Sequence, residues 1–264
     1  MTLRSFDRVA DLYDRTRGYP PAVAGRIADG IVQALSDHTA LDGRLLDVGA
    51  GTGRHGLGLA QRGVRYVGVD IARGMLERFR ARDRAAAARL LLAEASRLPF
   101  RDASFAAALT VHVLHVVPDA ERMVAEMRRV VRPGGVLLLG MDRWTQRLRD
   151  ELYRRLQETF AEGERPPPPR TDAMVTQQMA DRLEERGWYL EYRVLATIGR
   201  RTSAAEVLGS IERRTWSWTW QVREEPLRRA LQQLRQDLLA EGGDLDRAVD
   251  DRGEFVLHVA RPAG

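Results

Sequence analysis

The sequence predicts an α/β protein with a doubly wound, mostly parallel sheet of seven strands, of which the last is antiparallel. Short apolar runs alternate with helical patterns through the first half of the chain, which indicates strand–helix–strand units on a parallel sheet. The first apolar run leads directly into three alternate glycines, Gly49, Gly51 and Gly53. The second run ends in an acidic residue, Asp70. This combination is typical of sheets that bind a small-molecule cofactor.

The first half of the chain contains five predicted strands and four predicted helices. Pro133, Gly134 and Gly135 predict a turn that ends the last of these helices and begins the fifth strand. Right-handed crossovers would bring the carboxyl ends of the strands to one edge, where a ligand binds at the switch in strand order. The strands are expected at residues 44–48, 65–69, 89–93, 105–111 and 135–141, and the helices at 20–37, 54–62, 73–83 and 119–131.

The second half is less regular, and it predicts two further strands separated by helical segments. Four consecutive prolines at 166–169 are expected to form a stiff, extended connector. Trp216, Trp218 and Trp220 either anchor the longest insertion or form an apolar substrate wall. The expected elements are helices at about 143–162, 172–186 and 227–238, the last of them amphipathic, and strands at 188–197 and 255–260.

A single domain over residues 1–264 is the organisation expected from this pattern. Insertions of this length on a compact sheet are usually lids or substrate walls, so we expect the helical insertions to form a lid. The expected parts are a core of 38–141, 188–198 and 254–261, an N-terminal cap of 1–37, and helical insertions at 142–187 and 199–250.

The composition is that of an ordinary globular protein, with 44% hydrophobic and 30% charged residues. The net charge of +5 arises from 42 basic and 37 acidic residues with interspersed signs, which is only weak support for nucleic-acid binding.

The absence of cysteine excludes disulfides, thiolate metal sites and a cysteine nucleophile, and no metal site is expected. Because asparagine is absent too, a heat-adapted source is expected. Since neither a secretory signal nor a membrane-spanning run is present, we expect a cytoplasmic protein without membrane partners.

The spacing of the glycines narrows the kind of cofactor. Arg54 follows the G-x-G-x-G run where a dinucleotide-binding loop has its third glycine, and a Walker phosphate loop is excluded because the chain has no lysine. Glycine allows close approach of the backbone to a ligand, and the helix start offers free N–H groups. Asp70, at the end of the second strand, is placed to accept both hydroxyls of a ribose. The alternatives are a purely structural turn and an Asp70 that caps the following helix.

These motifs resemble those of class I S-adenosylmethionine-dependent methyltransferases, and the chain is most similar to the small-molecule group that includes quinone-biosynthesis and trans-aconitate methyltransferases. The resemblance covers roughly residues 6–141, and it implies a Rossmann-like sheet and a segment at 13–20 that caps the cofactor. In the C-terminal part of the chain, only the last two predicted strands show this resemblance. The runs that carry it, in family order, are Leu46-Asp47-Val48-Gly49-Ala50-Gly51-Thr52-Gly53, Val69-Asp70, Leu98-Pro99-Phe100-x-Asp102-x-Ser104-Phe105 and Arg129-Val130-Val131-Arg132-Pro133-Gly134-Gly135.

The resemblance implies a set of cofactor-binding residues. Residues of the glycine turn would line the amino-acid and ribose part, and Asp70 would take the ribose hydroxyls. Ile71 and Met75 would contact the adenine, and Glu94 would accept from its amino group. Arg17 would pair with the cofactor carboxylate. The full set is Tyr13, Arg17, Tyr19, Gly49, Ala50, Gly51, Asp70, Ile71, Met75, Glu94, Ala95, Ser96 and Val111.

Several members of this set have structural alternatives. Met75 is equally suited to the core, and Tyr13 and Tyr19 could be aromatics at the edge of the core with a polar tip. Glu94 could be an exposed loop acid, and it is one methylene longer than the aspartate usual in the family.

His112 and His115 are the candidate catalytic residues, since they are the histidines nearest the predicted site and imidazole titrates close to neutrality. A structural role for either histidine is the alternative.

The expected function is methyl transfer from S-adenosylmethionine to an unidentified small-molecule acceptor, with S-adenosylhomocysteine as the product. The alternatives are a cofactor-binding regulator without catalysis and, less favoured, an NAD-dependent oxidoreductase. Nucleic acid is disfavoured as a partner because no Asn/Asp-Pro-Pro-aromatic tetrapeptide is present to grip a flipped base.

Overall fold

The computed structural model describes residues 18–38, 40–145, 147–166 and 170–263. The chain divides into two compact units. The sheet unit comprises the described residues of Met1–Arg143, Thr171–Thr197 and Glu254–Gly264, and the helical unit comprises those of Trp144–Arg170 and Ile198–Gly253.

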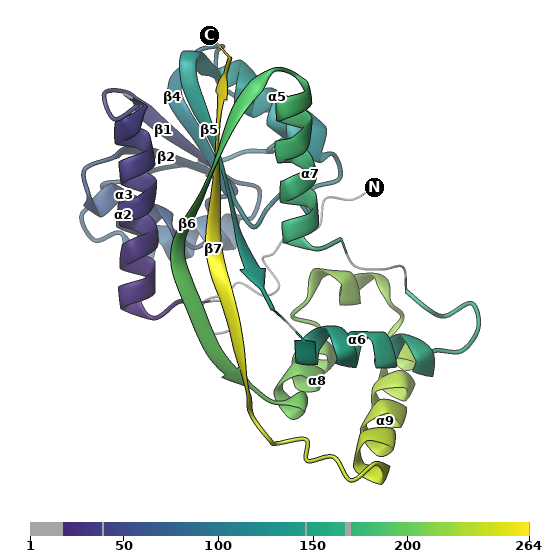
Figure 1. Cartoon of the computed structure of the whole chain (residues 1–264). Helices are drawn as coiled ribbons and strands as arrows, with labels where there is room; N and C mark the ends of the chain where they lie inside the picture. Colours follow the sequence, from purple (N-terminus) through teal and green to yellow (C-terminus); the bar gives the residue numbers. More distant parts are fainter. Residues whose placement is uncertain (1–17, 39, 146, 167–169, 264) are drawn as a thin grey trace. The chain divides into compact units, whose positions relative to one another are not determined.

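A seven-stranded sheet with the order β3-β2-β1-β4-β5-β7-β6 forms the centre of the fold. The first five strands pair in parallel, and β7 runs antiparallel to its neighbours (Figure 1). This arrangement confirms the predicted Rossmann-like class. The strands are β1 (Arg44–Val48), β2 (Arg65–Asp70), β3 (Arg89–Leu92), β4 (Phe105–Val111), β5 (Val131–Trp144), β6 (Trp188–Thr202) and β7 (Val249–Pro262).

The central strands are apolar along nearly their whole length because both faces of the sheet are covered. All residues of β4 are buried, and β1 is buried except at Arg44. The chain goes from β1 outward to β2 and β3 and then returns to β4 on the other side of β1. The sheet therefore has its topological switch point between β1 and β4, where a ligand is expected at the carboxyl edge.

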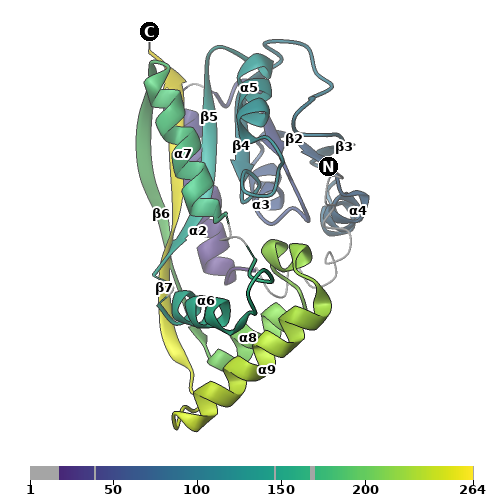
Figure 2. The same cartoon turned by 90° about the vertical axis from the view of Figure 1, so that its right-hand side faces the viewer.

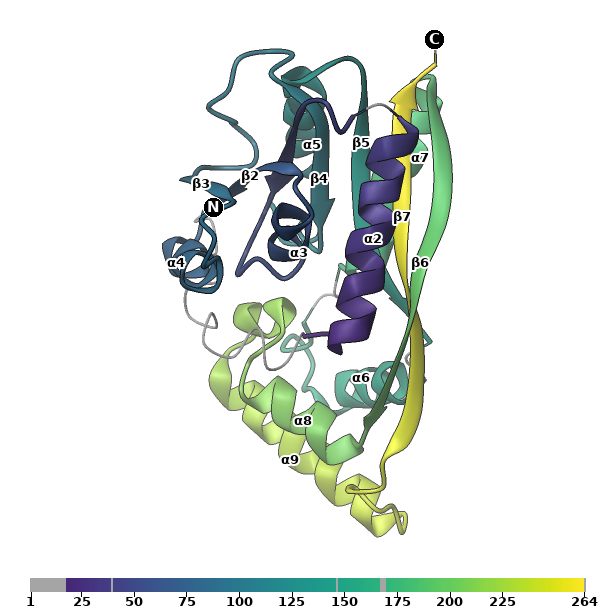
Figure 3. The ribbon, with the colours of Figure 1, turned by 90° about the vertical axis from the view of Figure 1, so that its left-hand side faces the viewer.

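Helices cover both faces of this sheet. Helices α2 (Pro21–Asp37) and α3 (Gly56–Gln61) lie on the face seen in Figure 3, and α5 (Ala120–Val130) and α7 (Asp172–Glu185) lie on the opposite face (Figure 2). Helix α4 (Arg73–Arg82) packs against β2 and β3. The apolar stripes of α5 and α7 are buried in one core cluster, to which Met123, Met127, Val175, Met179 and Leu183 contribute.

Strand β5 begins earlier than the sequence predicted. Helix α5 ends at Val130 and β5 begins at the next residue. Val131 pairs with Phe105 and Val136 pairs with Ala107, so the residues between them form an irregularity within the strand. Gly134 lies there with φ +75°, a conformation that glycine adopts without steric cost. The predicted turn is thus a bulge inside β5 rather than a separate connection.

The helical unit has a hydrophobic cluster of its own. Its helices are α6 (Arg147–Thr159), α8 (Ala204–Glu212), the 3₁₀ helix η2 (Ser217–Gln221) and α9 (Glu224–Ala240). Trp216 and Trp218 pack against this cluster, and the indole N–H of Trp220 donates to the carbonyl of Arg214 at 2.7 Å. These contacts favour an anchoring role for the tryptophans. Among the described residues, no helix combines the length and apolarity that a membrane crossing requires.

Candidate functional site

Glycine is needed for different structural reasons at the three positions after β1. All three have positive φ, at +85° for Gly49, +55° for Gly51 and +82° for Gly53. A Cβ on Gly49 would lie 2.2 Å from Val113 Cγ2, and one on Gly53 would lie 2.6 Å from Phe79 Cδ2. At Gly51 the nearest heavy atom would be the Gly49 carbonyl oxygen at 3.9 Å. Gly49 and Gly53 therefore permit close internal packing, whereas Gly51 presents its backbone to open space.

Asp70 lies at the end of β2 and reaches back to the glycine turn. Its Oδ2 accepts from the Gly51 N–H at 2.8 Å, and its Oδ1 accepts from the Ala72 N–H at 2.8 Å. The second bond is formed at the residue that caps α4, so the capping interpretation applies as well. An ionised carboxylate only accepts hydrogen bonds, as the hydroxyls of a ribose require. The carboxylate that the sequence predicts for this role therefore lies within hydrogen-bond distance of half-buried Gly51.

The predicted adenine contacts lie in unequal environments. Ile71 is 38% exposed, whereas Met75 is 3% exposed and belongs to the core. Ala50 and Val111 are also buried, with 7% and 8% exposure. The described structure thus offers Ile71 as the apolar surface next to Asp70.

The loop after β3 contains the remaining predicted contacts that the structure describes. Glu94 is exposed, and the Ser96 hydroxyl donates to its carboxylate. Ala95 packs against the main core cluster. Tyr13 and Arg17 lie outside the described residues.

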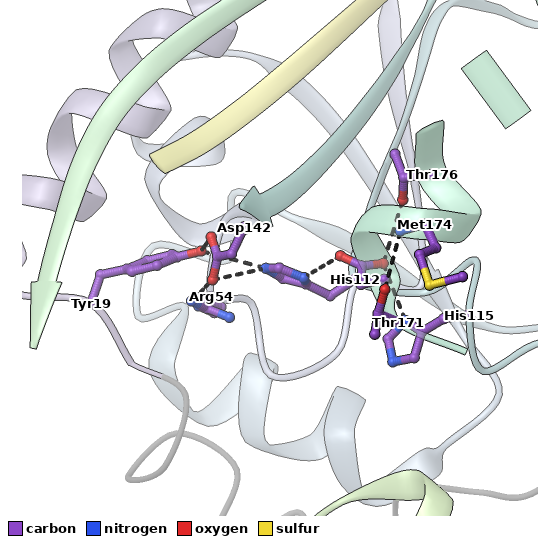
Figure 4. Close-up of polar contacts among 9 residues, drawn as sticks. Tyr19, Arg54, His112, His115, Asp142, Thr171, Met174 and Thr176 are labelled. Carbon is purple, nitrogen blue, oxygen red and sulfur yellow. Dashed lines mark hydrogen bonds and ion pairs between the residues drawn. The ribbon is translucent and has the colours of Figure 1, made fainter. Parts of the chain in front are cut away.

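A second group of polar side chains lies at the carboxyl ends of β4 and β5 (Figure 4). His112 directly follows β4, Asp142 lies in β5, and Asp172 is the first residue of α7. His112 Nδ1 lies 2.6 Å from Asp172 Oδ2, and His112 Nε2 lies 3.4 Å from Asp142 Oδ2. His112 is thus placed between two carboxylates in a nearly buried environment.

The same group includes two side chains from the start of the described chain and from the glycine turn. Tyr19 donates its hydroxyl to Asp142 Oδ1 at 2.5 Å. Arg54 Nη2 lies 3.6 Å from Asp142 Oδ2, and the guanidinium carbon lies 3.6 Å from the centre of the Tyr19 ring. These contacts combine an ion pair with a cation–π interaction. Asp142 therefore joins the glycine turn, β4 and the segment before α2.

The charges of this group follow from its geometry. Burial would lower the pKa of His112, but Asp142 and Asp172 raise it to about 9. Burial would likewise raise the pKa of each carboxyl group, but the facing His112 cation holds both values well below the usual range. At neutral pH His112 is therefore an imidazolium that donates from both nitrogens, and it has no lone pair with which to accept a proton.

His115 contacts the same carboxylate as His112. Its Nδ1 lies 3.1 Å from Asp172 Oδ1, and its side chain is 17% exposed. Among the described residues, none bonds to its Nε2. The structure thus brings both predicted histidines together around Asp172, a residue that the sequence indicated only as a helix start.

Asp142, Asp172 and Arg54 are site residues that sequence reasoning missed. Thr171 and Asp172 form a recognisable helix start, and the Thr171 hydroxyl accepts from the Met174 N–H at 3.3 Å. No local pattern pairs position 172 with position 112, because only tertiary packing, in which α7 and β4 contribute to one core cluster, brings them together. The structure forms no metal-binding group of histidine and carboxylate side chains within its described residues.

The glycine turn and the strands around it match a family model described as a methyltransferase domain, over residues 46–139. The biotin biosynthesis bifunctional protein BioHC of Cellvibrio japonicus is 34% identical over 132 residues, which make up 50% of this chain and 25% of that protein. The malonyl-[acyl-carrier protein] O-methyltransferase of Serratia marcescens is 35% identical over 134 residues, which make up 51% of this chain and 49% of that protein. The chain thus spans half or less of the length of these relatives.

Solved structures resemble the chain over a greater length. One from Anaeromyxobacter dehalogenans, provisionally named a type II methyltransferase, has a TM-score of 0.55 at 22% identity and covers 93% of this chain and 98% of that one. A likeness at this level of identity shows the fold alone. Residues 46–139 thus match a methyltransferase domain, and the sheet that contains them has the fold of a solved methyltransferase structure.

Proposed function

We propose that this protein transfers a methyl group from S-adenosylmethionine to a small-molecule acceptor. The observation that supports this proposal most directly is the hydrogen bond between Gly51 and Asp70 at the switch point of the sheet. The proposed ribose-binding carboxylate is thereby held beside the backbone of the glycine turn. The alternative, a cofactor-binding regulator without catalysis, shares the same pocket, because a fold does not by itself specify a reaction.

The residues of the turn fit an adenosyl cofactor. A Cβ built on Gly51 would approach no non-adjacent heavy atom closer than 3.9 Å, and the Asp70 carboxylate is the kind of acceptor that ribose hydroxyls require. Ile71 offers an apolar surface for the adenine, and Glu94 is exposed at the end of β3. Tyr19 belongs to the proposed binding set as well, and its hydroxyl is oriented by Asp142.

Methyl transfer requires the protein to align the two reactants, and it needs no covalent intermediate on the protein. Bound S-adenosylmethionine supplies an electrophilic methyl group, and the acceptor attacks it in line with the breaking carbon–sulfur bond. The protein holds the two reactants in line and excludes water. The carboxyl edge of β4 is suited to this task because His112 and His115 follow that strand, and because Gly49 packs against the intervening Val113.

Calorimetric titration with S-adenosylmethionine tests the cofactor site. We expect Asp70→Ala to weaken binding about tenfold to a hundredfold, since hydrogen bonds to a charged group contribute roughly 1.5–3 kcal/mol each. Asp83→Ala is the matched control, because Asp83 also accepts a backbone N–H, from Ala88 at 2.8 Å. Unchanged affinity in Asp70→Ala, or an equal loss in the control, would contradict the proposed site.

A panel of acceptors distinguishes the enzyme from the regulator. The enzyme should release S-adenosylhomocysteine when phenols, carboxylates or amines are supplied, whereas the regulator should bind the cofactor and release none. Cell extract extends the panel, because a methylated product from labelled cofactor would reveal an acceptor outside it.

A further inference from the structure

We propose that Asp172 positions His115 as the general base for an acceptor with an acidic hydroxyl group, a phenol or an enol. In the same contact, Asp172 helps to hold His112 in its cationic form, which has no lone pair with which to accept a proton. The inference rests on the proposed methyl transfer and names the class of acceptor for it.

Asp172 divides its two oxygens between two imidazole rings. Oδ2 lies 2.6 Å from His112 Nδ1, and Oδ1 lies 3.1 Å from His115 Nδ1. An ionised carboxylate only accepts hydrogen bonds, so both Nδ1 atoms carry protons. The neutral form of His115 therefore has its lone pair on Nε2, the nitrogen to which no described residue forms a hydrogen bond. Figure 4 shows that nitrogen turned away from the cluster.

Asp172 is held firmly enough to orient a catalytic ring. It is the first residue of α7, whose inner face is buried at Val175, Met179 and Leu183. The Thr171 hydroxyl caps this helix by accepting from the Met174 N–H. A carboxylate in the first turn of a helix also interacts favourably with the helix dipole. The orientation of His115 is thus determined by a packed helix rather than by a loop.

His112 is unsuited to the role of base because charged groups surround it. Asp172 from α7 and Asp142 from β5 face its two nitrogens. The hydroxyl of Tyr19 lies 3.5 Å from Nε2, and the centres of the His112 ring and the half-buried His55 ring are 6.4 Å apart. Arg54 pairs with the far side of the Asp142 carboxylate. With a proton on each nitrogen, His112 contributes a fixed charge that keeps Asp172 ionised.

An available lone pair on His115 defines the chemistry of the acceptor. The acceptor oxygen gives its proton to Nε2 of His115 while its electron pair forms the new carbon–oxygen bond. The carbon–sulfur bond of the donor breaks, its electrons stay on sulfur, and the imidazolium later releases the proton to water. A carboxylate acceptor has no proton to give. An imidazole oriented by a carboxylate can also take the proton of an aliphatic alcohol, but phenols and enols give up theirs at far lower cost. Phenols and enols match the base.

Turnover of three probes by the protein tests this assignment. Catechol represents phenols, 4-hydroxycoumarin represents enols, and monomethyl malonate represents carboxylates. We expect catechol or 4-hydroxycoumarin to be methylated, and His115→Gln to reduce kcat by about 10²–10⁴-fold with an unchanged dissociation constant for S-adenosylmethionine. In a plot of kcat against pH, Asp172→Asn should shift the acidic limb, whereas Asp181→Asn on the same helix should leave that limb unchanged.

Nitrogen NMR of the histidine rings tests the same point without any acceptor. The wild type should show His115 protonated at Nδ1 in its neutral form and His112 doubly protonated at pH 7, and Asp172→Asn should abolish the fixed tautomer of His115. Methylation of malonate alone, or full phenol turnover by His115→Gln, would overturn the inference and leave methyl transfer intact. Cofactor binding without turnover of catechol or 4-hydroxycoumarin would also overturn it. A failure to bind S-adenosylmethionine would instead overturn the proposed function.

Discussion

At the scale of single residues, the carboxyl edge of the sheet combines strained backbone with buried charge. His112 has a φ of +60°, a left-handed conformation that costs a residue with a Cβ roughly 1–2 kcal/mol. The turn at this residue directs the ring between Asp142 and Asp172. The two charge-assisted contacts offset the backbone cost, and the strain is thus tied to the arrangement that fixes both histidines.

A second buried acid lies beneath the glycine turn. Asp47 in β1 is 4% exposed, and the Tyr66 hydroxyl donates to its Oδ2 at 2.6 Å. Burial raises the pKa of Asp47 to about 7, although the bond from Tyr66 opposes the shift. The folded protein therefore binds this proton more tightly than the unfolded chain does.

This difference predicts how stability depends on pH. The contribution of Asp47 is fully present below the ordinary value of 3.8 and is lost as pH rises through about 7. We expect Asp47→Asn to remove that loss and to gain at most about 4 kcal/mol relative to wild type above pH 7, at 1.36 kcal/mol per pKa unit. Urea unfolding at pH 5 and pH 8 measures the effect. Parallel pH profiles for the two proteins would contradict the prediction.

The sequence could identify site residues that lie in a local motif but not those assembled by packing. Gly51 and Asp70 were predictable because strand, turn and strand end are close along the chain, and the structure places them 2.8 Å apart. Asp172 was not, because its role depends on where α7 packs. His112 was predicted by position, but its charge state follows from two partners distant in sequence.

At the scale of elements, apolar runs predicted the strands well, and local signals decided where helices begin. Strands β1 and β4 have the predicted bounds, because each is a short, mostly apolar run that ends where the chain turns. Helix α8 was missed, although Ser203 and Glu206 form a capping box that the sequence displays. The ends of β5 were misjudged because proline and glycine in a bulge resemble those in a turn.

The cap of α7 is an element-scale feature that affects the site. Thr171→Ala removes the bond to the Met174 N–H, and we expect it to cost about 1 kcal/mol of stability. It should also speed hydrogen exchange in the first turn of α7 and loosen Asp172. Thr171→Ser retains a hydroxyl cap and serves as the control. Equal exchange rates in all three proteins would show that the cap does not hold this turn.

At the scale of the whole molecule, each of the two units has a core of its own. The cluster of the helical unit is formed entirely by residues of Trp144–Arg170 and Ile198–Gly253. All described residues of the candidate cofactor site belong to the sheet unit. The sequence predicted the helical insertions but not this separate core, because apolar periodicity shows which face of a helix is buried and not what it packs against.

Independent cores predict separable stability. Leu231 on α9 is 2% exposed, whereas Leu239 on the same helix is 57% exposed. We expect Leu231→Ala to destabilise the helical unit by about 2–5 kcal/mol and Leu239→Ala to change stability by less than about 0.5 kcal/mol. Hydrogen exchange should show lost protection in α6, α8 and α9 of Leu231→Ala, with β1 and β4 still protected and cofactor affinity unchanged. Simultaneous loss in both units would indicate one cooperative structure.

One carboxylate shared by two rings also makes the histidines interdependent. Asp172 is the common point through which a change at one ring reaches the other. Loss of either imidazole would leave one oxygen of this nearly buried carboxylate without its partner, and the remaining ring would have to compensate for more of its charge. A substitution at one histidine would therefore disturb the other, even though the two rings bind different oxygens of Asp172.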